Sequence, residues 1–314
     1  MVMDFRLEDT KPGTVSKYWL KVISDGFANP ICIPVIVARG VEPGPIMGVT
    51  AAVHGNELNG ISVVQRLFRE VDPNELRGTL VGVPVVNVPA FIRKKRRFND
   101  GVDLNHIMPG KEDGNISQVY AYRFMDRLIK HFDYLLDLHT ASTGRINSYY
   151  VRADMNEPKV EQLALLQNAD IIVHNPPSDG TLRGAAAALG IPAITLEVGN
   201  PSTFQKRLIR SGVDGIHNVL CHLSMTDDDV IDNHKQTVLC KRSMWIYTDT
   251  GGLLTVEAEL RQRLAKGEII AHLRDIFGEK VKDYHAPHDG IVIGKSVSPV
   301  NQTGGRILHL GLFE

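Results

Sequence analysis

The sequence is poor in cysteine, balanced in charge and free of long apolar runs. Its 314 residues include three cysteines, Cys32, Cys221 and Cys240. An odd number at wide spacing argues against a disulfide framework and favours a reducing compartment, so we expect a cytoplasmic protein. Because the formal net charge is −1, the molecule as a whole has no field to attract nucleic acid or a membrane surface, and we expect neither as a partner.

Signals for membrane insertion and secretion are also missing from the sequence. No segment reaches the roughly 18 consecutive apolar residues that a bilayer-spanning helix needs, and residues 1–6 contain no apolar stretch of the signal-peptide kind. The sequence shows no internal repeat and no low-complexity tract. With 43% hydrophobic residues, a chain of this length can bury a sizeable core and has room for two domains.

The middle of the chain alternates apolar runs with helix-like patterns, the longest helix being expected at residues 202–223. Three of the runs end at a titratable side chain: residues 46–53 precede His54, residues 134–138 precede His139, and residues 191–196 precede Glu197. Near-continuous apolar runs that alternate with helices are typical of parallel strands covered on both faces. We therefore predict an α/β fold with a mostly parallel, doubly wound sheet over residues 1–236.

The pattern changes near residue 237 to short strands separated by glycine turns. It predicts a small C-terminal β-rich domain at residues 237–314. The hairpin spacing loosely resembles a lipoyl-type barrel, in which a carrier lysine stands in a tight turn. Lys295 is the nearby candidate, but it lacks the flanking acidic and methionine residues of such a turn, which disfavours a carrier function.

The polar residues at the strand ends predict a metal site. Ligands of open α/β sheets bind outside the carboxyl ends of the strands, where we place His54, Glu57, His139 and Glu197. Two histidines and one glutamate leave the fourth zinc position open for water, and zinc both activates that water and polarises a carbonyl oxygen. Glu197 is then available to move a proton from the water to a leaving nitrogen. We expect one Zn²⁺ per chain, held by the other three residues.

Each of these residues also has a simpler interpretation when it is taken alone. A His-x-x-Glu spacing such as that of His54 and Glu57 arises by chance in many sequences. A single histidine at a strand end is usually a satisfied polar residue, and a single glutamate there is usually a helix cap or an ion-pair partner. The metal site is therefore predicted from the convergence of the set.

A basic run, Arg93-Lys94-Lys95-Arg96-Arg97, lies between two of the predicted strands. It reads either as a solvated loop or as a loop from which one arginine turns into the active site while its neighbours stay in water. Nucleic-acid binding is the weakest interpretation, because no aromatic residues interleave the run.

Four motifs occur in order along the chain: His54-Gly55-Asn56-Glu57, Asp103-Leu104-Asn105, Asp137-Leu138-His139 and Leu196-Glu197-Val198-Gly199. Together they resemble the succinylglutamate desuccinylase/aspartoacylase family, whose members are relatives of zinc carboxypeptidases. The motifs cover roughly residues 45–200, and the C-terminal β-rich domain fits the resemblance too. The resemblance implies a sheet like that of the zinc carboxypeptidases.

The resemblance also implies roles for individual residues. His54, Glu57 and His139 would bind the zinc, Glu197 would be the general base, and Asp103 would accept a hydrogen bond from His54 and so orient that ligand. Arg97 resembles the arginine that polarises the scissile carbonyl and binds the oxyanion, with Arg96 as the alternative. Asn105 and His106 stand where the family binds substrate, and Arg183 resembles an arginine that some members use on a substrate carboxylate.

One position departs from the family pattern, which usually reads Asp-Leu-Asn-Arg. Here His106 follows Asn105. Arginine offers a permanently charged, bidentate fork, whereas histidine is short and only partly charged near neutral pH. Either the substrate lacks the carboxylate that this pair would clamp, or another group such as Arg145 or Arg183 supplies the charge.

The function expected from the sequence is hydrolysis of the amide bond of an N-acylated amino acid or a related small metabolite by a zinc-dependent deacylase. One alternative is a metallocarboxypeptidase acting on peptides, which needs an open groove and the carboxylate clamp that His106 weakens. Another is a non-catalytic metal-binding or ligand-binding protein, which would have no need of a base at Glu197. The acyl group, the amine and assembly into a homo-oligomer are left open.

Overall fold

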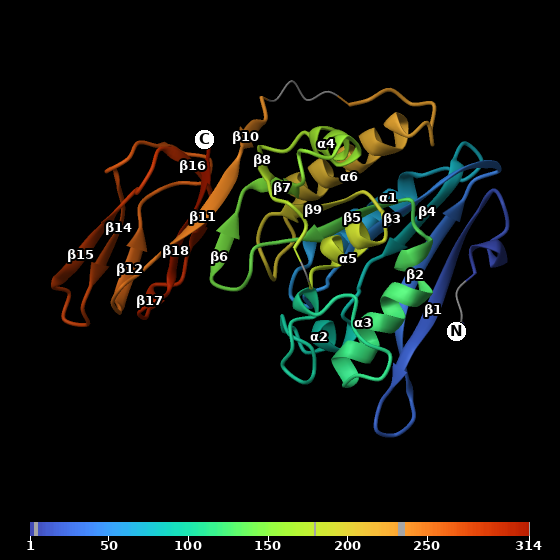
Figure 1. Cartoon of the computed structure of the whole chain (residues 1–314), viewed down its shortest axis with the longest axis horizontal. Coiled ribbons are helices and arrows are strands. Elements are labelled where there is room, and N and C mark those ends of the chain that lie inside the picture. Colours follow the sequence, from blue (N-terminus) through green and yellow to red (C-terminus); the bar gives the residue numbers. More distant parts are fainter. Residues whose placement is uncertain (3–5, 179, 232–235, 314) are drawn as a thin grey trace.

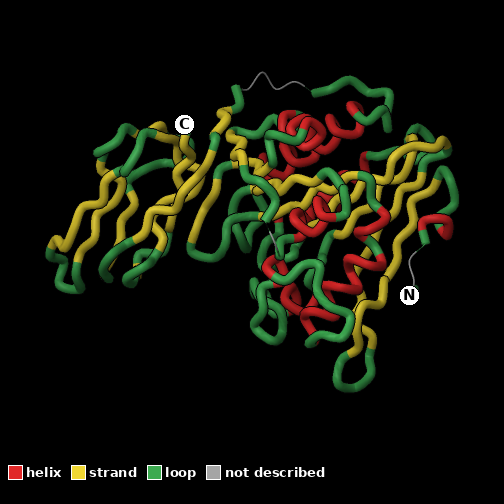
Figure 2. The backbone as a smooth tube through the Cα atoms, in the orientation of Figure 1, coloured by secondary structure: helices red, strands yellow, loops and turns green. Residues whose placement is uncertain are grey.

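The computed structural model describes residues 1–2, 6–178, 180–231 and 236–313. A nine-stranded sheet flanked by helices forms the larger part of the molecule, and strands and loops without helices form the other end (Figures 1 and 2). Among the described residues, no helix is long and apolar enough to cross a membrane. The three cysteines are free.

The large sheet has the strand order β1-β2-β4-β3-β5-β9-β7-β8-β10. Its strands are β1 (Thr14–Ser24), β2 (Pro30–Arg39), β3 (Glu42–Ala51), β4 (Arg77–Val83), β5 (Tyr134–His139), β7 (Tyr149–Ala153), β8 (Ile171–His174), β9 (Ala193–Val198) and β10 (Val238–Cys240). The central strands β4, β3, β5 and β9 are parallel, β1 and β2 form an antiparallel hairpin at one edge, and β7 runs antiparallel to β9. The prediction of a mostly parallel sheet is confirmed.

Helices cover both faces of this sheet, as the doubly wound pattern predicts. They are α1 (Asn59–Glu70), α2 (Val88–Ile92), α3 (Ile116–Arg127), α4 (Pro158–Leu165), α5 (Leu182–Ala188) and α6 (Lys206–His222). Buried residues of α1, α4 and α6 share one hydrophobic core with the sheet, and those of α3 and α5 share a second core on the opposite face. The sheet therefore separates two apolar layers.

Side-chain alternation along β5 and β9 determines which face carries the polar residues. In β5, Leu136 and Leu138 point into the core shared with α1 and α6. Because successive side chains of a strand point to opposite faces, Asp137 and His139 point to the face covered by α3 and α5. β9 pairs with β5 in parallel so that Glu197 lies opposite His139, and the two side chains share that face.

Three features of the fold differ from the sequence expectation. The strands β6 (Arg145–Asn147) and β7 were not predicted, because they are only three and five residues long. Helix α6 begins at Lys206 and not at residue 202. Ser202 has a φ of 57°, in the left-handed region, and the side chain of Asn59 accepts a hydrogen bond from the Gln205 backbone (2.9 Å), so residues 200–205 form a turn before the helix.

The C-terminal part contains two antiparallel sheets with their own hydrophobic core. Their strands are β11 (Arg242–Tyr247), β12 (Gly252–Val256), β13 (Arg263–Leu264), β14 (Ile269–Arg274), β15 (Lys280–His285), β16 (Gly290–Ser296), β17 (Val300–Asn301) and β18 (Arg306–Leu312). Lys295 lies within β16, buried, and its Nζ donates to Glu259 Oε1 at 3.0 Å. It is not presented in a turn, which removes the carrier interpretation.

Strand β6 connects the two parts of the molecule. It leaves the large sheet after β5 and pairs antiparallel with β16, so that Asn147 lies opposite Gly294 (Figure 1). A Cβ at Gly294 would lie 2.3 Å from the Asn147 side-chain oxygen, so a larger residue there would displace the Asn147 side chain. The boundary between residues 236 and 237 stays a proposal. β10, just beyond it, still pairs with β8 of the large sheet.

Candidate active site

The turn after β3 positions the first two candidate ligands. Beyond the end of the strand, Ala52 takes a left-handed conformation with a φ of 52°, which turns the chain sharply. A Cβ at Gly55 would lie 2.2 Å from the backbone of Ala90, so glycine is required there. The turn places His54 and Glu57 at the carboxyl end of the sheet before α1 begins. Both side chains are buried.

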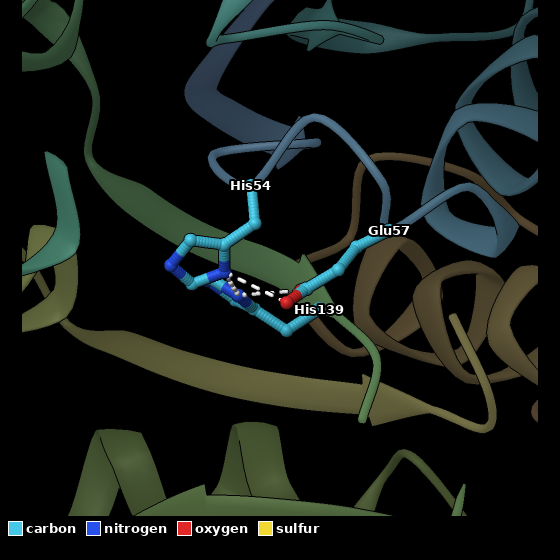
Figure 3. A group of neighbouring side chains, drawn as sticks. All are labelled: His54, Glu57 and His139. Atoms are coloured by element: carbon cyan, nitrogen blue, oxygen red, sulfur yellow. Dashed lines mark hydrogen bonds and ion pairs between the residues drawn. The ribbon is translucent and has the colours of Figure 1, made fainter. Parts of the chain in front are cut away.

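The structure brings His54, Glu57 and His139 together at this end of the sheet, with one donor atom of each within 4.8 Å of the others. The two imidazole rings and the carboxylate point toward one another (Figure 3). Nδ1 of His54 lies 2.8 Å from Glu57 Oε1 and 3.2 Å from Nδ1 of His139, which in turn lies 3.1 Å from Glu57 Oε2. Among the described residues this is the one such group of three.

The outer nitrogen of each histidine faces a carboxylate. Nε2 of His54 lies 2.9 Å from Asp103 Oδ1, as the sequence resemblance implied, and Nε2 of His139 lies 2.7 Å from Asp137 Oδ2. Sequence reasoning missed Asp137 as a partner of His139, although two residues apart on one strand share a face. Carboxylates in these places set the tautomer that leaves Nδ1 free to bind a metal ion.

Charges within the group act on one another strongly. Burial would raise the pKa of the Glu57 carboxyl, but His54 and His139 outweigh burial and hold that pKa well below its usual value. Burial would likewise lower the pKa of His139, but Asp137 and Glu57 raise it well above its usual value. Two inward imidazole nitrogens and an ionised carboxylate form a donor set that suits Zn²⁺.

Glu197 lies beside the group, almost entirely buried. Its Oε2 accepts a hydrogen bond from Asn147 Nδ2 at 3.2 Å, and its Oε1 lies 3.8 Å from Arg152 Nε. Arg152 is itself held by hydrogen bonds from Nε and Nη2 to the Tyr150 hydroxyl, at 3.1 and 2.9 Å. Burial raises the pKa of Glu197, while Arg152 and His139 oppose that rise. A carboxyl with a raised pKa suits proton transfer near neutral pH.

The basic loop sends one arginine toward the candidate ligands. Arg96 Nη1 donates to Glu57 Oε1 (3.0 Å) and to Ser142 Oγ (2.9 Å), and Arg96 Nε donates to Asp103 Oδ2 (2.9 Å). Arg97 is exposed and donates to the backbone carbonyl of Gly101 (2.9 Å). The structure therefore brings the alternative arginine to the ligand group and not Arg97, whose role stays a prediction.

The predicted substrate-binding residues, Asn105, His106 and Arg183, line a cavity beside the ligand group. They differ in how many of their polar atoms are free to contact a substrate. Asn105 Oδ1 accepts a hydrogen bond from the Leu182 backbone at 2.8 Å, and His106 is exposed. The Arg183 guanidinium donates to the backbone and side-chain oxygens of Asn175, both at 2.7 Å. Burial lowers the pKa of Arg183 to about 10. Arg183 thus anchors a loop beside α5, and its planar fork is already used.

The candidate residues line one cavity of about 470 Å³. Sequence reasoning missed part of its wall, because that part comes from β6, β7 and the C-terminal sheet: Asn147, Tyr150, Arg152, Trp245 and Arg306. No local pattern marks these residues, since only strand pairing over a long sequence separation brings them to the site.

Comparisons with known proteins identify the family of the chain. A family model described as the succinylglutamate desuccinylase/aspartoacylase catalytic domain matches residues 43–223. The chain is 24% identical over 307 residues to an N-alpha-acetyl-L-2,4-diaminobutyric acid deacetylase of Halomonas elongata, covering 93% of this chain and 89% of that protein. It is 31% identical over 170 residues to a succinylglutamate desuccinylase of Pseudomonas paraeruginosa, covering 50% of this chain and 51% of that one.

Solved structures share the fold over nearly the whole chain. The product-bound ectoine utilization protein EutE (DoeB) from Ruegeria pomeroyi has a TM-score of 0.87 at 22% identity and covers 95% of both chains. A succinylglutamate desuccinylase/aspartoacylase structure from Rhodobacter sphaeroides has a TM-score of 0.88 at 20% identity and covers 100% of this chain and 99% of that one.

Proposed function

The chain belongs to the succinylglutamate desuccinylase/aspartoacylase family, and from this premise we propose that it is a zinc-dependent deacylase that hydrolyses the amide bond of an N-acylated amino acid. One observation carries the proposal: the buried group of His54, Glu57 and His139 lies beside Glu197, a carboxylate that the group does not include. A protein that only binds metal needs the first three residues and has no use for the fourth.

Each residue of the site has a defined part in this reaction. His54, Glu57 and His139 would hold the zinc ion through two Nδ1 atoms and a carboxylate. When bound there, zinc supplies a Lewis acid for the amide carbonyl and an activated water. Glu197 takes the proton of the attacking water and passes it to the leaving nitrogen. Arg96 is the donor that reaches the ligand group, and we assign it to the oxygen on which negative charge develops.

Two neighbours prepare Glu197 for its part. Asn147 donates to one carboxylate oxygen, and Arg152 lies beside the other. These contacts hold the carboxylate in one orientation, and the positive charge of Arg152 limits how far burial raises its pKa. The base is therefore positioned before the substrate arrives.

The names of the relatives guide the choice of substrates to test. One relative is named for removing an acetyl group and another for removing a succinyl group, each from an amino acid. A peptide substrate fits the site less well, because Trp245 and Arg306 of the C-terminal sheet stand in the cavity wall and restrict an open groove.

The test is release of free amine from a panel of N-acetyl and N-succinyl amino acids and short peptides, with zinc content measured on the same protein. We expect turnover of acyl amino acids, loss of turnover with a chelator and recovery on adding zinc. Glu197→Gln is the matched control, because it keeps the three ligands and removes the base. A zinc-loaded protein that releases no amine, or that is as active with Gln at this position, contradicts the proposal.

A further inference from the structure

The wall of the active-site cavity carries an excess of positive charge. Among the described residues, six arginines and three carboxylates line it: Arg96, Arg97, Arg145, Arg152, Arg183, Arg306, Glu57, Asp103 and Glu197. A cavity lined mainly by one sign of charge concentrates ligands of the opposite sign. The question is which of these arginines are free to contact such a ligand.

Four of the six arginines already have oxygen acceptors within the protein. Arg96 donates to Glu57 and Asp103, and Arg152 donates to the Tyr150 hydroxyl. The two remaining arginines of this set, Arg183 and Arg97, donate to backbone oxygens of nearby loop residues, Asn175 and Gly101.

Arg145 and Arg306 differ from these four. Within the described part of the chain, neither side chain has a hydrogen bond or a carboxylate partner, and both lie over the same indole, that of Trp245. The guanidinium carbon Cζ lies 5.4 Å from the ring centroid for Arg145 and 4.9 Å for Arg306. Cation–π contacts of this kind orient a guanidinium without using its N–H donors.

The platform under the two arginines is built to stay in place. The Trp245 ring stacks on the His309 ring, with centroids 4.7 Å apart and an interplanar angle of 9°. The two residues are paired across β11 and β18. His309 is buried, and its Nε2 lies 2.8 Å from Ser243 Oγ. Rotation of the indole away from the arginines would therefore break its stack on the buried His309 ring.

The two guanidinium groups come from two strands that flank β16 in the C-terminal sheet. Arg145 begins β6, and Arg306 begins β18 of the C-terminal sheet. Burial lowers the pKa of Arg145, and the nearby charges of Arg306 and Arg96 lower it further. The carboxylates of Glu197 and Glu57 oppose this lowering. Two like charges held close together repel each other, and an anion bound between them relieves that repulsion.

We propose that Arg145 and Arg306, held on Trp245, bind a carboxylate of the N-acyl substrate. This rests on the proposed deacylase function and names the group that the site selects: an acyl amino acid with a free carboxylate. Planar guanidinium forks match a carboxylate in geometry and in charge. The pair supplies the charge that His106 does not, from two strands that both pair with β16.

The experiment compares substrates that differ only in charge. The probes are the N-acetylamino acid that wild type hydrolyses fastest, the carboxamide of the same compound, and N-succinylmethylamine, whose carboxylate lies on the acyl side. The variants are Arg145→Gln and Arg306→Gln, each with its lysine counterpart. Arg263→Gln is the matched control, because Arg263 also lies over an aromatic ring, that of Phe313, but not in the cavity.

We expect each glutamine variant to raise KM for the charged substrate about 10- to 100-fold, the range of charge-assisted hydrogen bonds, with kcat and the carboxamide little changed. Lysine should restore part of the loss, and the control should behave as wild type. A raised KM for the acetylamino acid places the bound carboxylate on the amine side of the substrate. A raised KM for the succinyl probe places it on the acyl side. An equal rise in KM for the acid and the carboxamide, or no rise in either, overturns the proposal.

A binding measurement separates this proposal from the deacylase function. If wild type hydrolyses none of the probes, the deacylase proposal fails, and titration calorimetry with succinate still tests the arginine pair. Weaker succinate binding by Arg145→Gln than by wild type and the Arg263→Gln control supports an anion subsite. Equal binding by all three proteins refutes it.

Discussion

The two walls of the active-site cavity are built in different ways. One wall carries His54, Glu57 and His139 at the ends of parallel strands, each close in sequence to an apolar run. The opposite wall comes from short antiparallel strands and from the C-terminal sheet, where Arg152 and Trp245 lie. The groups to which we assign the reaction thus lie on the regular part of the fold, while those to which we assign orientation and selection lie where two sheets meet.

The largest effect is expected from substitutions of the candidate metal ligands in the first wall. His54→Ala and His139→Ala should each lose the bound metal and with it measurable turnover, because two remaining ligands do not hold zinc at a tetrahedral site. Elemental analysis of purified protein measures the metal. Asp137→Asn is the graded control, since it leaves all three ligands and should weaken metal binding only about 10- to 100-fold. Unchanged metal content in both alanine variants would reject the ligand assignment.

Glu197→Gln tests whether Glu197, which lies opposite His139 in the paired strand β9, is a base or a further ligand. We expect kcat to fall on the order of 10²–10⁴-fold, because a positioned proton-transfer group contributes that much, while the zinc content stays that of wild type. Single-turnover kinetics and elemental analysis on the same sample give both values. A variant that loses its metal, or keeps wild-type kcat, would contradict the role.

Arg96→Ala and Arg97→Ala compare two adjacent residues of one loop. Arg96→Ala should lower kcat about 10²–10³-fold, the range seen when a single oxyanion donor is removed. The same change at 97 should have little effect, because that side chain is exposed and bonded to the Gly101 carbonyl. Steady-state kinetics of both variants decide the matter. Equal losses would favour a diffuse basic patch over one specific donor.

Arg152→Gln should give the smallest effect, a shift in the pH profile. Burial raises the pKa of Glu197 and Arg152 lowers it, so removing this positive charge raises that pKa further. The base must be deprotonated to act, so kcat/KM falls as pH falls through its pKa, and the acidic limb should move to higher pH. Arg152→Lys keeps the charge and should keep the limb near its wild-type position. A limb that stays fixed in the glutamine variant would argue that Arg152 does not act on the base.

Sequence patterns predict the first wall because its signals are local. The apolar runs before His54, His139 and Glu197 are strands β3, β5 and β9, and parallel pairing brings their ends together. Alternation along a strand also explains why Asp137 and His139 share a face. The parallel sheet and its covering helices follow from the alternation of near-continuous apolar runs with helical patterns.

The second wall could not be predicted in the same way. Nothing in a run of five basic residues distinguishes Arg96 from Arg97, because a loop has no period that assigns a direction to each side chain. Strand β6 has three residues and no apolar run, and its partner β16 lies far along the chain. Trp245 reaches the cavity only through that long-range pairing, which leaves no trace in the residues around it.

The close approach of Gly294 to Asn147 has a consequence for how the protein matures. Chains fold as they are synthesised, N-terminal parts first, so the three candidate ligands leave the ribosome well before residues 290–296. A three-residue strand has little stability of its own, and Asn147 lacks its pairing with β16 until that strand has been made. A nascent or truncated chain could thus capture metal while its base is still unsupported, and hydrolytic competence would be acquired last.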